Sequence, residues 1–413
     1  MRILQCLDTL NPRAGGTVEA CRVLTLGMLR QNQDVEVVTL SPPDNPWSAR
    51  WPCPVHCLGP SYTRYLYSPR LIPWLIANCA NYDALVVHNI YRYIGYGVWR
   101  ATRTTGSRYY LFTHGMLAPW FRTQSLKYAK KTIFWKLAGH RMFRDAATVL
   151  YTAEDEMAYA RYSFSPYQCQ EHVVGLGIAD PVGAIEPDVT AFRPVAPYLL
   201  FLGRITPKKR VDLLIRAFAS VYRNDPMRLV IAGPDEDGLT AQYSRLPESR
   251  ALGGRLIWTG HLDVQQKWSA LAGADAIALV SHTENFGIAL VEALAMGVPV
   301  LTTRKVDIWR EISAAHAGFA FDDDLSGATQ LLANWRILTA AEKQTMRRNA
   351  RELFLRSFDI DRVTRRLLAV LAESKGQPPP YAAPPHPPSR ESPVLVSAPT
   401  QSESPLSSIP HSH

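Results

Sequence analysis

The chain has 413 residues, of which 47% are hydrophobic and 20% charged, and its formal net charge is +9. This composition is sufficient for two cores of ordinary domain size and excludes a mainly disordered or fibrous chain. No apolar run reaches the roughly 18 residues of a membrane-spanning helix, and Asp8 comes too early for a signal peptide. The six cysteines lack the spacing of a zinc or redox site, so we expect reduced thiols and a cytoplasmic protein.

Predicted strands and helices alternate in the first part of the chain, which we expect to form an N-terminal domain over residues 1–185. Such alternation is typical of a parallel sheet with helices on both faces. A helix is expected at residues 18–29, and the apolar runs that predict strands are residues 2–7, 35–40, 84–87, 109–112 and 148–151.

Several positions that follow these strands are candidates for a ligand site. Gly15 and Gly16 lie between the first strand and the first helix, where glycine lets the backbone approach a ligand closely. His114 and His88 each follow a strand, and ligands of such sheets bind beyond the carboxyl ends of the strands. We therefore expect His114 to face an interdomain cleft. A glycine pair is also typical of a tight turn, and a single histidine of a structural residue.

The same alternation returns in the second part of the chain, which we expect to form a C-terminal domain over residues 186–350. Three prolines mark residues 182–197 as the linker, and residues 351–375 are expected to be helical. Residues 376–413 contain 11 prolines among 38 residues and predict a disordered tail. The strands expected in this part are residues 198–202, 228–232, 255–258, 276–280 and 298–302.

A pair of acids, Glu284 and Glu292, stands on either side of a predicted helix start. Residues 276–280 predict a buried strand, and residues 288–296 predict a helix that Asn285 would cap. Carboxylates on both sides of the helix start suit a sugar nucleotide, whose hydroxyl groups donate hydrogen bonds at both ends. The alternative interpretation of this pair is an ordinary amphipathic helix with a solvated glutamate.

The predicted helix start is also suited to a phosphate group. The N–H groups of Phe286, Gly287 and Ile288 lack helical partners, and the helix dipole adds positive charge there. Upstream, Arg204 and Lys209 stand before another predicted helix, where two fixed cations are suited to clamping a diphosphate.

Together the two stretches resemble the donor half of GT-B glycosyltransferases of the retaining glycosyltransferase family 4. That family has the pattern Gly-Arg-Leu-x-x-x-Lys-Gly-x-Asp, followed by Ser-x-x-Glu-x-Phe-Gly-x-x-x-x-Glu-Ala-x-Ala-x-Gly-x-Pro-Val. Arg210 replaces the second glycine of the first pattern. The matching positions are Gly203, Arg204, Lys209, Asp212, Ser281, Glu284, Phe286, Gly287, Glu292, Ala293, Gly297, Pro299 and Val300.

The first part of the chain adds to this resemblance. The string Thr-His-Gly-Met-Leu-x-Pro-Trp that begins at Thr113, together with Thr152-Ala-x-x-Glu156, resembles bacterial exopolysaccharide and capsule glycosyltransferases of the same family. The resemblance covers residues 1–372 and implies two facing Rossmann-like domains. It also implies that the segment 351–375 crosses back to the first domain.

The resemblance further implies a nucleotide-sugar donor, linked to UDP or GDP, and an assignment of the site. Arg204 and Lys209 would neutralise the departing diphosphate, Glu284 and His114 would contact the transferred sugar, and Glu292 would hold the ribose. The other donor-binding positions would be Gly15, Gly16, Gly203, Asn285, Phe286, Gly287 and Ile288.

No side chain is assigned as a nucleophile, because the leaving phosphate is thought to receive the acceptor's proton on the same face of the sugar. Since the two cations can take the place of a metal, we expect neither a divalent ion nor a cofactor. The expected function is that of a retaining hexosyltransferase that acts on a glycan or lipid-linked glycan in the synthesis of exopolysaccharide or another cell-surface polysaccharide.

Charge is unevenly distributed along the chain. Residues 46–144 contain 14 lysines and arginines and a single acid, Asp83. Because basic residues alternate there with aromatic ones such as Trp135 and Phe143, we predict docking at the inner face of the plasma membrane. A solvated basic face is the alternative, and nucleic acid is not expected because no nucleic-acid motif accompanies the patch. The predicted membrane or acceptor patch consists of Arg122, Lys127, Lys130, Lys131 and Lys136.

Two other functions stay open at this point. One is a sugar-nucleotide epimerase or a phosphorylase on the same scaffold. The other is a non-catalytic scaffold that binds through the basic patch and the Pro-rich tail. The presence of Arg204, Lys209, Glu284 and Glu292 in one chain argues against the non-catalytic scaffold.

Overall fold

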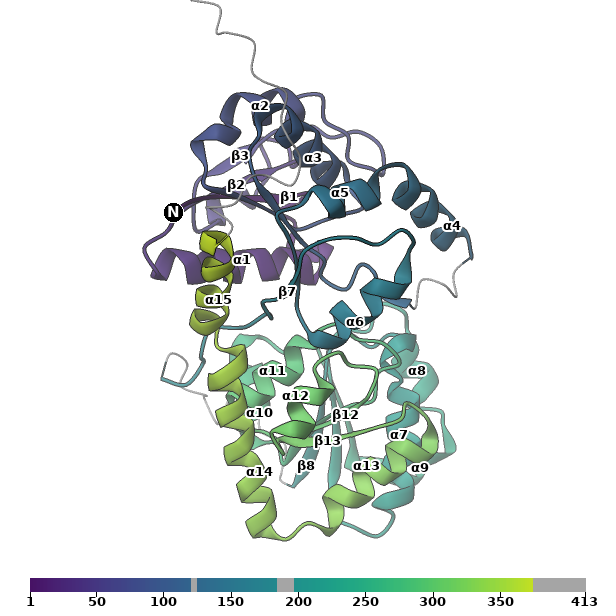
Figure 1. Cartoon of the computed structure of the whole chain (residues 1–413). Helices are drawn as coiled ribbons and strands as arrows, with labels where there is room; N and C mark the ends of the chain where they lie inside the picture. The colour runs from purple at the N-terminus through teal and green to yellow at the C-terminus, as the bar shows by residue number, and fades with distance from the viewer. Residues whose placement is uncertain (120–124, 184–196, 374–413) are drawn as a thin grey trace, which may run out of the picture.

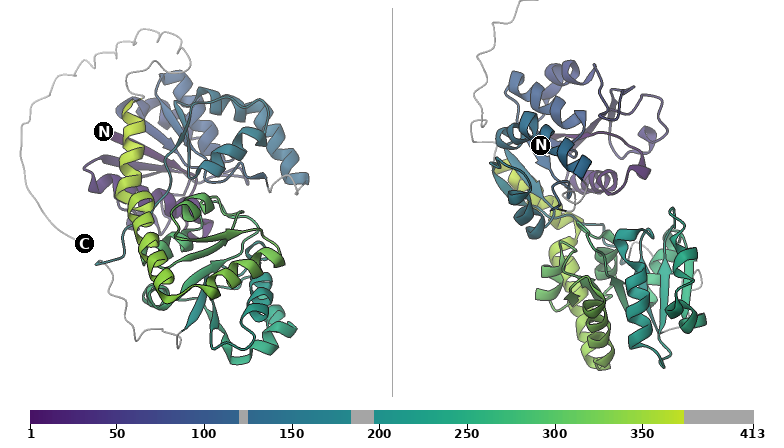
Figure 2. Two further views of the ribbon diagram at one scale, coloured as in Figure 1. Left: turned by 60° about the horizontal axis from the view of Figure 1, so that its bottom comes forward. Right: turned by 90° about the vertical axis from the view of Figure 1, so that its right-hand side faces the viewer.

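The chain folds into two facing α/β domains, with a helical segment that runs from the second domain back to the first (Figure 1). The computed structural model describes residues 1–119, 125–183 and 197–373. The predicted tail, most of the predicted linker and the expected boundary between the domains lie outside these residues. The described residues include both sheets and the cavity between them, and Figure 2 shows the two domains from two further sides.

The N-terminal domain has one sheet of seven parallel strands in the order β3-β2-β1-β4-β5-β6-β7. The five predicted strands are present, four of them with the predicted bounds, because their apolar side chains are buried under helices. Prediction missed β3 and β7, which have three residues each and lie at the sheet edges, where strands are only partly buried. The elements are β1 (Arg2–Leu7), α1 (Gly16–Arg30), β2 (Asp34–Thr39), β3 (Val55–Cys57), α2 (Leu71–Asn78), β4 (Ala84–Val87), α3 (Tyr93–Thr105), β5 (Tyr109–Phe112), α4 (Ser125–Phe134), α5 (His140–Asp145), β6 (Thr148–Tyr151), α6 (Glu154–Ser163) and β7 (Glu171–Val173).

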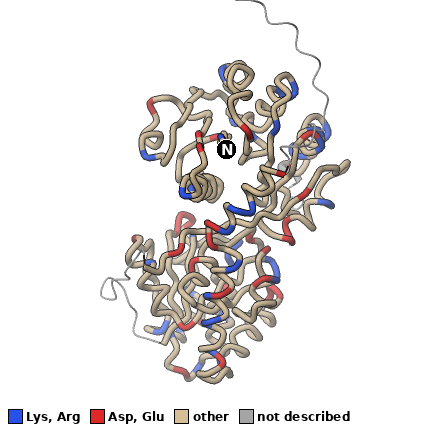
Figure 3. Tube along the Cα trace, turned by 60° about the vertical axis from the view of Figure 1, so that its left-hand side comes forward, with Lys and Arg blue, Asp and Glu red and all other residues tan. Residues whose placement is uncertain are grey.

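The C-terminal domain has a sheet of six parallel strands in the order β10-β9-β8-β11-β12-β13. Lysines and arginines are interspersed with acids along its trace (Figure 3). The five predicted strands are present, and the missed strand, β13, is a partly exposed edge strand. The elements are β8 (Tyr198–Leu202), α7 (Val211–Val221), β9 (Arg228–Ala232), α8 (Leu239–Tyr243), α9 (Pro247–Leu252), β10 (Leu256–Gly260), α10 (Val264–Gly273), β11 (Ala276–Leu279), α11 (Ile288–Ala295), β12 (Val300–Thr303), α12 (Trp309–Ala314), β13 (Gly318–Phe321) and α13 (Leu325–Ile337).

Two helices, α14 (Ala340–Leu353) and α15 (Ile360–Glu373), connect the domains. A π-helical turn separates them, and α15 packs against α1 of the N-terminal domain, where Arg30 and Asp361 form an ion pair of 2.8 Å. Gly27 permits this close packing, because a Cβ atom there would lie 2.2 Å from Thr364 Oγ1. The predicted crossing back to the first domain is thus confirmed. None of the described helices is both long and apolar enough to cross a lipid bilayer.

Candidate active site

A cavity of about 1110 Å³ lies between the two domains, lined by residues that follow strands of both sheets. Its position agrees with the general placement of ligands beyond the carboxyl ends of parallel strands. Neither Gly15 nor Glu292 is among its lining residues. The predicted site residues that do line it are Gly16, His114, Gly203, Arg204, Lys209, Glu284, Asn285, Phe286, Gly287 and Ile288.

The C-terminal side of the cavity presents fixed positive charge. Arg204 follows β8 and is 59% exposed, so its guanidinium is accessible to a ligand. Lys209 is largely buried, and its ammonium forms an ion pair with the Glu284 carboxylate. Glu284 thereby fixes the position of the Lys209 ammonium at the cavity wall. Sequence reasoning did not single out the further cations that line the cavity, namely Lys208, Arg304, Lys305 and Arg310.

Arg210 explains why a glycine occurs after the lysine in the resembled family. Its backbone has a φ of 52°, in the left-handed region that glycine adopts without steric cost. The departure therefore strains the turn between Lys209 and α7 by about 1 kcal/mol. The Arg210 guanidinium lies 3.8 Å from Asp212 and is not part of the cavity lining.

The start of α11 lines the cavity, but its N-cap residue differs from the predicted one. Gly287, with a φ of 68°, is the N-cap residue, and no side chain caps the helix. The predicted cap by Asn285 is wrong, because its amide instead donates to Thr152 Oγ1 across the domain interface at 3.2 Å. The N–H groups of Phe286 and Gly287 have no acceptor among the described residues, and they lie where the helix dipole attracts an anion.

The N-terminal side of the cavity is built around His114, which follows β5 as predicted. Its ring stacks on Phe112 at a centroid distance of 4.5 Å, and its Nε2 lies 2.9 Å from Nδ1 of His88. His88 is fully buried and contacts Gln5 through its other nitrogen, so it supports His114 and does not line the cavity. Burial lowers the pKa of His114 to about 3, so its imidazole is neutral near pH 7.

Glu156 holds the loop that carries His114. This fully buried carboxylate accepts hydrogen bonds from Thr113 Oγ1 at 2.6 Å and from the backbone N–H of Gly115. It also accepts from the N–H and the hydroxyl of Thr152, at 2.7 and 2.6 Å. Burial raises the pKa of Glu156, whereas the four donors favour its ionised form. The string Thr152-Ala-x-x-Glu156 is therefore a device that positions the His114 loop.

Contacts between the two domains join α6 to the segment 304–310, and several of these residues line the cavity. Tyr159 donates to the Asp307 carboxylate at 2.9 Å, and Asp155 accepts from Trp309 Nε1 at 2.7 Å. Arg310 also donates to Asp155, at 2.6 Å. Burial raises the pKa of Asp307 well above its ordinary range, and neighbouring carboxylates add to this effect. Prediction missed these residues because nothing in their local sequence distinguishes them from surface helix residues.

Glu292 lies in an adjoining cavity of about 420 Å³, between α1, α10 and α11. Leu176 and Ile288 line both cavities, so the two are neighbours. Lys267 donates to Glu292 at 2.5 Å; burial raises the pKa of this carboxyl, and the Lys267 ammonium opposes that shift. Glu284 and Glu292 thus line two neighbouring cavities.

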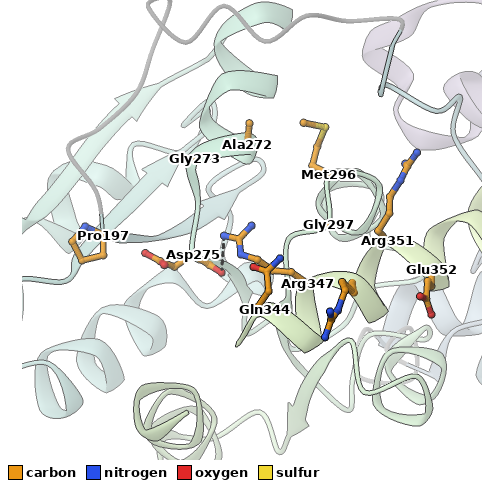
Figure 4. A pocket seen from close by; sticks show the side chains of 11 residues that line it. Pro197, Ala272, Gly273, Asp275, Met296, Gly297, Gln344, Arg347, Arg351 and Glu352 are labelled. Carbon is orange, nitrogen blue, oxygen red and sulfur yellow. Dashed lines mark hydrogen bonds between the residues drawn. The ribbon is translucent and has the colours of Figure 1, made fainter. Parts of the chain in front are cut away.

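A further hollow of about 890 Å³ lies at the amino ends of β8, β11 and β12, at the opposite end of these strands from the interdomain cavity (Figure 4). Two of its arginines end on backbone carbonyl groups, Arg347 on Ala274 and Arg351 on Ala295 at 2.8 Å. These carbonyl groups lie at the C-terminal ends of α10 and α11, where a cation is stabilising. Arg347 and Arg351 therefore hold helices together and are not directed at a ligand.

Metal ligands do not gather in the described part of the chain. No group of three or more His, Cys, Asp or Glu side chains there has an arrangement suited to a metal ion. An Asp-x-Asp string occurs at residues 235–237, but Asp235 accepts hydrogen bonds from the N–H groups of Leu239 and Thr240 at 2.9 and 2.7 Å. Its carboxylate is therefore engaged at the start of α8.

Comparisons with known proteins agree with this geometry. Residues 185–353 match the family "Glycosyl transferases group 1", and residues 15–177 match the "Glycosyl transferase 4-like domain". Among curated proteins, the chain is 34% identical over 114 residues to a D-inositol 3-phosphate glycosyltransferase of Nocardia farcinica. That match covers 26% of this chain and 25% of the relative. A protein of the same name from Frankia alni is 33% identical over 156 residues, which cover 32% of this chain and 38% of that one.

Solved structures share the fold over most of the chain. The Anabaena protein HepE in complex with UDP and glucose has a TM-score of 0.67 at 15% identity and covers 90% of this chain and 100% of its own. A glycosyltransferase from Rickettsia africae has a TM-score of 0.71 at 14% identity, covering 91% of this chain and 99% of its own. The C-terminal domain thus matches the group 1 glycosyl transferases and the N-terminal domain matches the glycosyl transferase 4-like domain, and together the two domains have the GT-B fold.

Proposed function

We propose that the protein is a retaining glycosyltransferase that moves a hexose from a nucleotide sugar to a glycan or lipid-linked glycan acceptor in the synthesis of a cell-surface polysaccharide. One observation carries the proposal. Arg204, Lys209 and the open start of α11 meet in a single cavity, and His114 faces them from the other domain. This combination provides cations and N–H groups for a diphosphate and a neutral imidazole for a sugar.

The cavity suits a reaction in which negative charge builds on a departing diphosphate. Arg204 and Lys209 supply fixed positive charge at the leaving group, and the N–H groups before α11 supply hydrogen bonds. Glu284 fixes the Lys209 ammonium and offers its remaining oxygen to a sugar hydroxyl. No side chain is required as a nucleophile, because the departing phosphate can receive the acceptor's proton on the same face.

The adjoining cavity suits the nucleoside part of the donor. The Glu292 carboxylate can accept hydrogen bonds from two ribose hydroxyls. For this, Lys267 either gives up its own hydrogen bond to Glu292 or shares the carboxylate with the ribose. One structural neighbour, HepE, has been solved in complex with UDP and with UDP-glucose, so UDP-sugars are the first donors to test. Because some relatives are D-inositol 3-phosphate glycosyltransferases, a phosphorylated polyol is a further acceptor to test.

A thermal-shift panel of UDP- and GDP-sugars tests donor binding, because a ligand at 100 times its Kd stabilises by about 2.7 kcal/mol. Product analysis with the donor that binds then tests the reaction. Glycosylated acceptor with free nucleoside diphosphate and an unchanged anomeric configuration is expected. A free epimer or a sugar phosphate identifies an epimerase or a phosphorylase instead. Since the proposal has no metal or cofactor, activity should persist in excess EDTA.

We further propose that α4 and the turn after it rest on an anionic membrane. Leu126, Ile133 and Leu137 are spaced to share one helix face and are 80%, 59% and 68% exposed. Lys130 and Lys136 are exposed beside them, and α4 lies at the outer edge of the N-terminal domain (Figure 1). Exposed aliphatic side chains flanked by lysines suit the interface of an anionic bilayer.

The membrane surface differs in composition from the predicted patch. Trp135 and Phe143 are 1% exposed and belong to the core. Lys131 is directed inward, where its ammonium donates to the Met116 carbonyl at 2.9 Å and lies 4.2 Å from the centre of the Tyr91 ring. Arg122 lies outside the described residues, and the side chain of Lys127 is not described.

Flotation with vesicles containing an anionic phospholipid tests the membrane proposal. Two variants should release the protein from the vesicles. The triple variant Leu126→Ser, Ile133→Ser, Leu137→Ser removes the aliphatic side chains that enter the interface. The double variant Lys130→Glu, Lys136→Glu removes two lysines, each of which contributes about 1 kcal/mol near an anionic leaflet. Reversal of Arg216 and Arg245, which are exposed on the C-terminal domain, is the matched control. If the variants of α4 float like the unchanged protein, the face is merely solvated.

A further inference from the structure

A chain of buried polar side chains connects the interior of the N-terminal domain to His114. It begins at the backbone carbonyl of Cys21 in α1 and passes through Thr25, Gln5 in β1 and His88 after β4. Gln5, Thr25 and His88 are all fully buried, so no water competes for their hydrogen bonds. Each link is therefore made between protein groups, and the Cys21 thiol also donates to Gln5 Oε1 at 3.5 Å.

The direction of each link follows from its first member, because a carbonyl oxygen only accepts. The Thr25 hydroxyl donates to the Cys21 carbonyl at 2.8 Å, so its oxygen accepts from Gln5 Nε2 at 2.5 Å. The amide nitrogen of Gln5 also lies 3.4 Å from the same carbonyl. The Gln5 side chain is therefore oriented with its oxygen toward His88 and its nitrogen toward α1.

The orientation of Gln5 determines where His88 carries its proton. His88 Nε2 lies 2.6 Å from Gln5 Oε1, which only accepts, so this nitrogen must be protonated. Burial and the neighbouring His114 lower the pKa of His88 well below its ordinary value, so the ring is neutral and its Nδ1 is bare. A bare Nδ1 accepts a hydrogen bond from His114 Nε2 across the 2.9 Å between them.

His114 then has a single arrangement open to it. Its Nε2 carries the proton, and the neutral ring leaves Nδ1 unprotonated. Nδ1 has no hydrogen-bond partner among the described residues, although His114 lines the cavity. The stack of His114 on Phe112, with 9° between the rings, opposes turning of the His114 ring, and the 21° between the rings of His114 and His88 suits a hydrogen bond between their edges.

We propose that Thr25, Gln5 and His88 form a relay that holds His114 in its Nε2–H tautomer, so that Nδ1 accepts a hydrogen bond from a hydroxyl group of the transferred sugar. The part that concerns the sugar rests on the proposed function, whereas the tautomer does not. Gln5, Thr25 and His88 are positioning residues, since they act on the substrate only through His114. A sugar without a hydroxyl at the position facing Nδ1 leaves that nitrogen unpaired and binds more weakly.

Nitrogen-15 spectroscopy of histidine-labelled protein tests the relay without any substrate. Two-bond proton–nitrogen spectra distinguish the two neutral tautomers, and the variants His88→Asn and His114→Asn identify the signals of the two rings. Both rings are expected as Nε2–H tautomers at pH 7. A protonated Nδ1 on His114 would overturn the proposal.

Two substitutions test whether the relay sets the tautomer. Gln5→Met removes the acceptor of the His88 Nε2–H with little change in volume, and His114 should then populate both tautomers. If Gln5→Met does not fold, the pair Thr25→Val and Thr25→Ser replaces it. Valine loses the oxygen that orients Gln5, whereas serine keeps it. An unchanged His114 signal in folded Gln5→Met or Thr25→Val would show that the relay does not act.

Donor analogues test the contact with the sugar. For the nucleotide sugar that binds best, each sugar hydroxyl is replaced in turn by hydrogen and by fluorine. At one position both replacements should weaken binding by about five- to tenfold, because neither can donate, and His114→Ala should abolish this difference. A fluorinated donor that binds like the parent at that position would make His114 a donor and overturn this part. If no nucleotide sugar binds, the proposed function fails, and the spectra still decide the tautomer.

Discussion

The C-terminal face of the cavity presents charge, whereas the N-terminal face presents a neutral imidazole supported by buried polar groups. On the first face, Arg204 and Lys209 follow one strand, and Glu284 follows another. On the second face, His114 is neutral and is held by His88 and by the loop that Glu156 anchors. The difference matches the two parts of a nucleotide sugar, since a diphosphate needs fixed cations and a sugar needs hydrogen-bond partners of defined direction.

The largest effect should come from the charged face. Arg204→Ala and Lys209→Ala should each lower kcat by about 100-fold or more, the loss that follows removal of one preorganised electrostatic group. Arg216→Ala, which removes an exposed arginine of α7, is the control and should leave kcat unchanged. Near-normal turnover in both site variants would mean that the charged face does not hold the leaving group.

Substitution of a buried polar group on the N-terminal face should instead lower the stability of the protein. Glu156→Gln should lower the free energy of unfolding by about 1–3 kcal/mol, because its amide NH₂ group would face N–H and O–H donors. Urea unfolding measures the change, and Glu154→Gln, an exposed acid on the same helix, is the control. Equal stability of Glu156→Gln and the parent would show that the buried carboxylate does not anchor the His114 loop.

Variants of Glu292 and Glu284 should distinguish nucleoside binding from catalysis. Glu292→Ala should mainly raise the KM for the donor, because ribose contacts are alike in the ground and transition states. Glu284→Ala should also lower kcat, since it frees the Lys209 ammonium from its fixed position. Steady-state kinetics with varied donor distinguishes the two patterns. Unaltered donor kinetics in both variants would place the donor elsewhere.

The smallest effect is expected where the two faces meet. Tyr159→Phe removes the hydroxyl that donates to Asp307 and should cost about 1 kcal/mol of unfolding free energy. Burial already raises the pKa of Asp307, and the loss of a donor should raise it further. Tyr62→Phe, an exposed position of the same domain, is the control. A change no larger than that of the control would argue that this contact does not join the domains.

Prediction from the sequence was most complete where function depends on residues that are close along the chain. The strands at residues 2–7 and 198–202 were predicted with their bounds, because parallel strands buried on both faces are continuous apolar runs. Arg204, Lys209 and Glu284 were predicted as site residues from their places near predicted helix starts and in the family pattern, and all three line the cavity. The edge strands β3, β7 and β13 were missed, because partly solvated strands lack that apolar signal.

Contacts between distant residues could only be decided by the tertiary structure. Asn285 reads as a helix cap in the sequence, but Thr152 from the other domain takes its amide. Lys131 reads as one of several surface lysines, yet its ammonium reaches the Met116 carbonyl beside His114. A polar side chain can form several different hydrogen bonds. The fold decides which partner is within reach, and that partner can be distant in the sequence.

The sequence by itself thus determined the central strands of both sheets and the charged residues Arg204, Lys209 and Glu284, because apolar runs and short motifs are local properties. The tertiary structure decided the orientation of the supporting face. Gln5 lies in β1 and His88, 83 residues later, follows β4, and their hydrogen bond exists only because these two strands are paired in the sheet. The tautomer of His114 follows from that pairing, because each hydrogen bond in the buried chain fixes which atom donates in the next one. No local sequence motif specifies this.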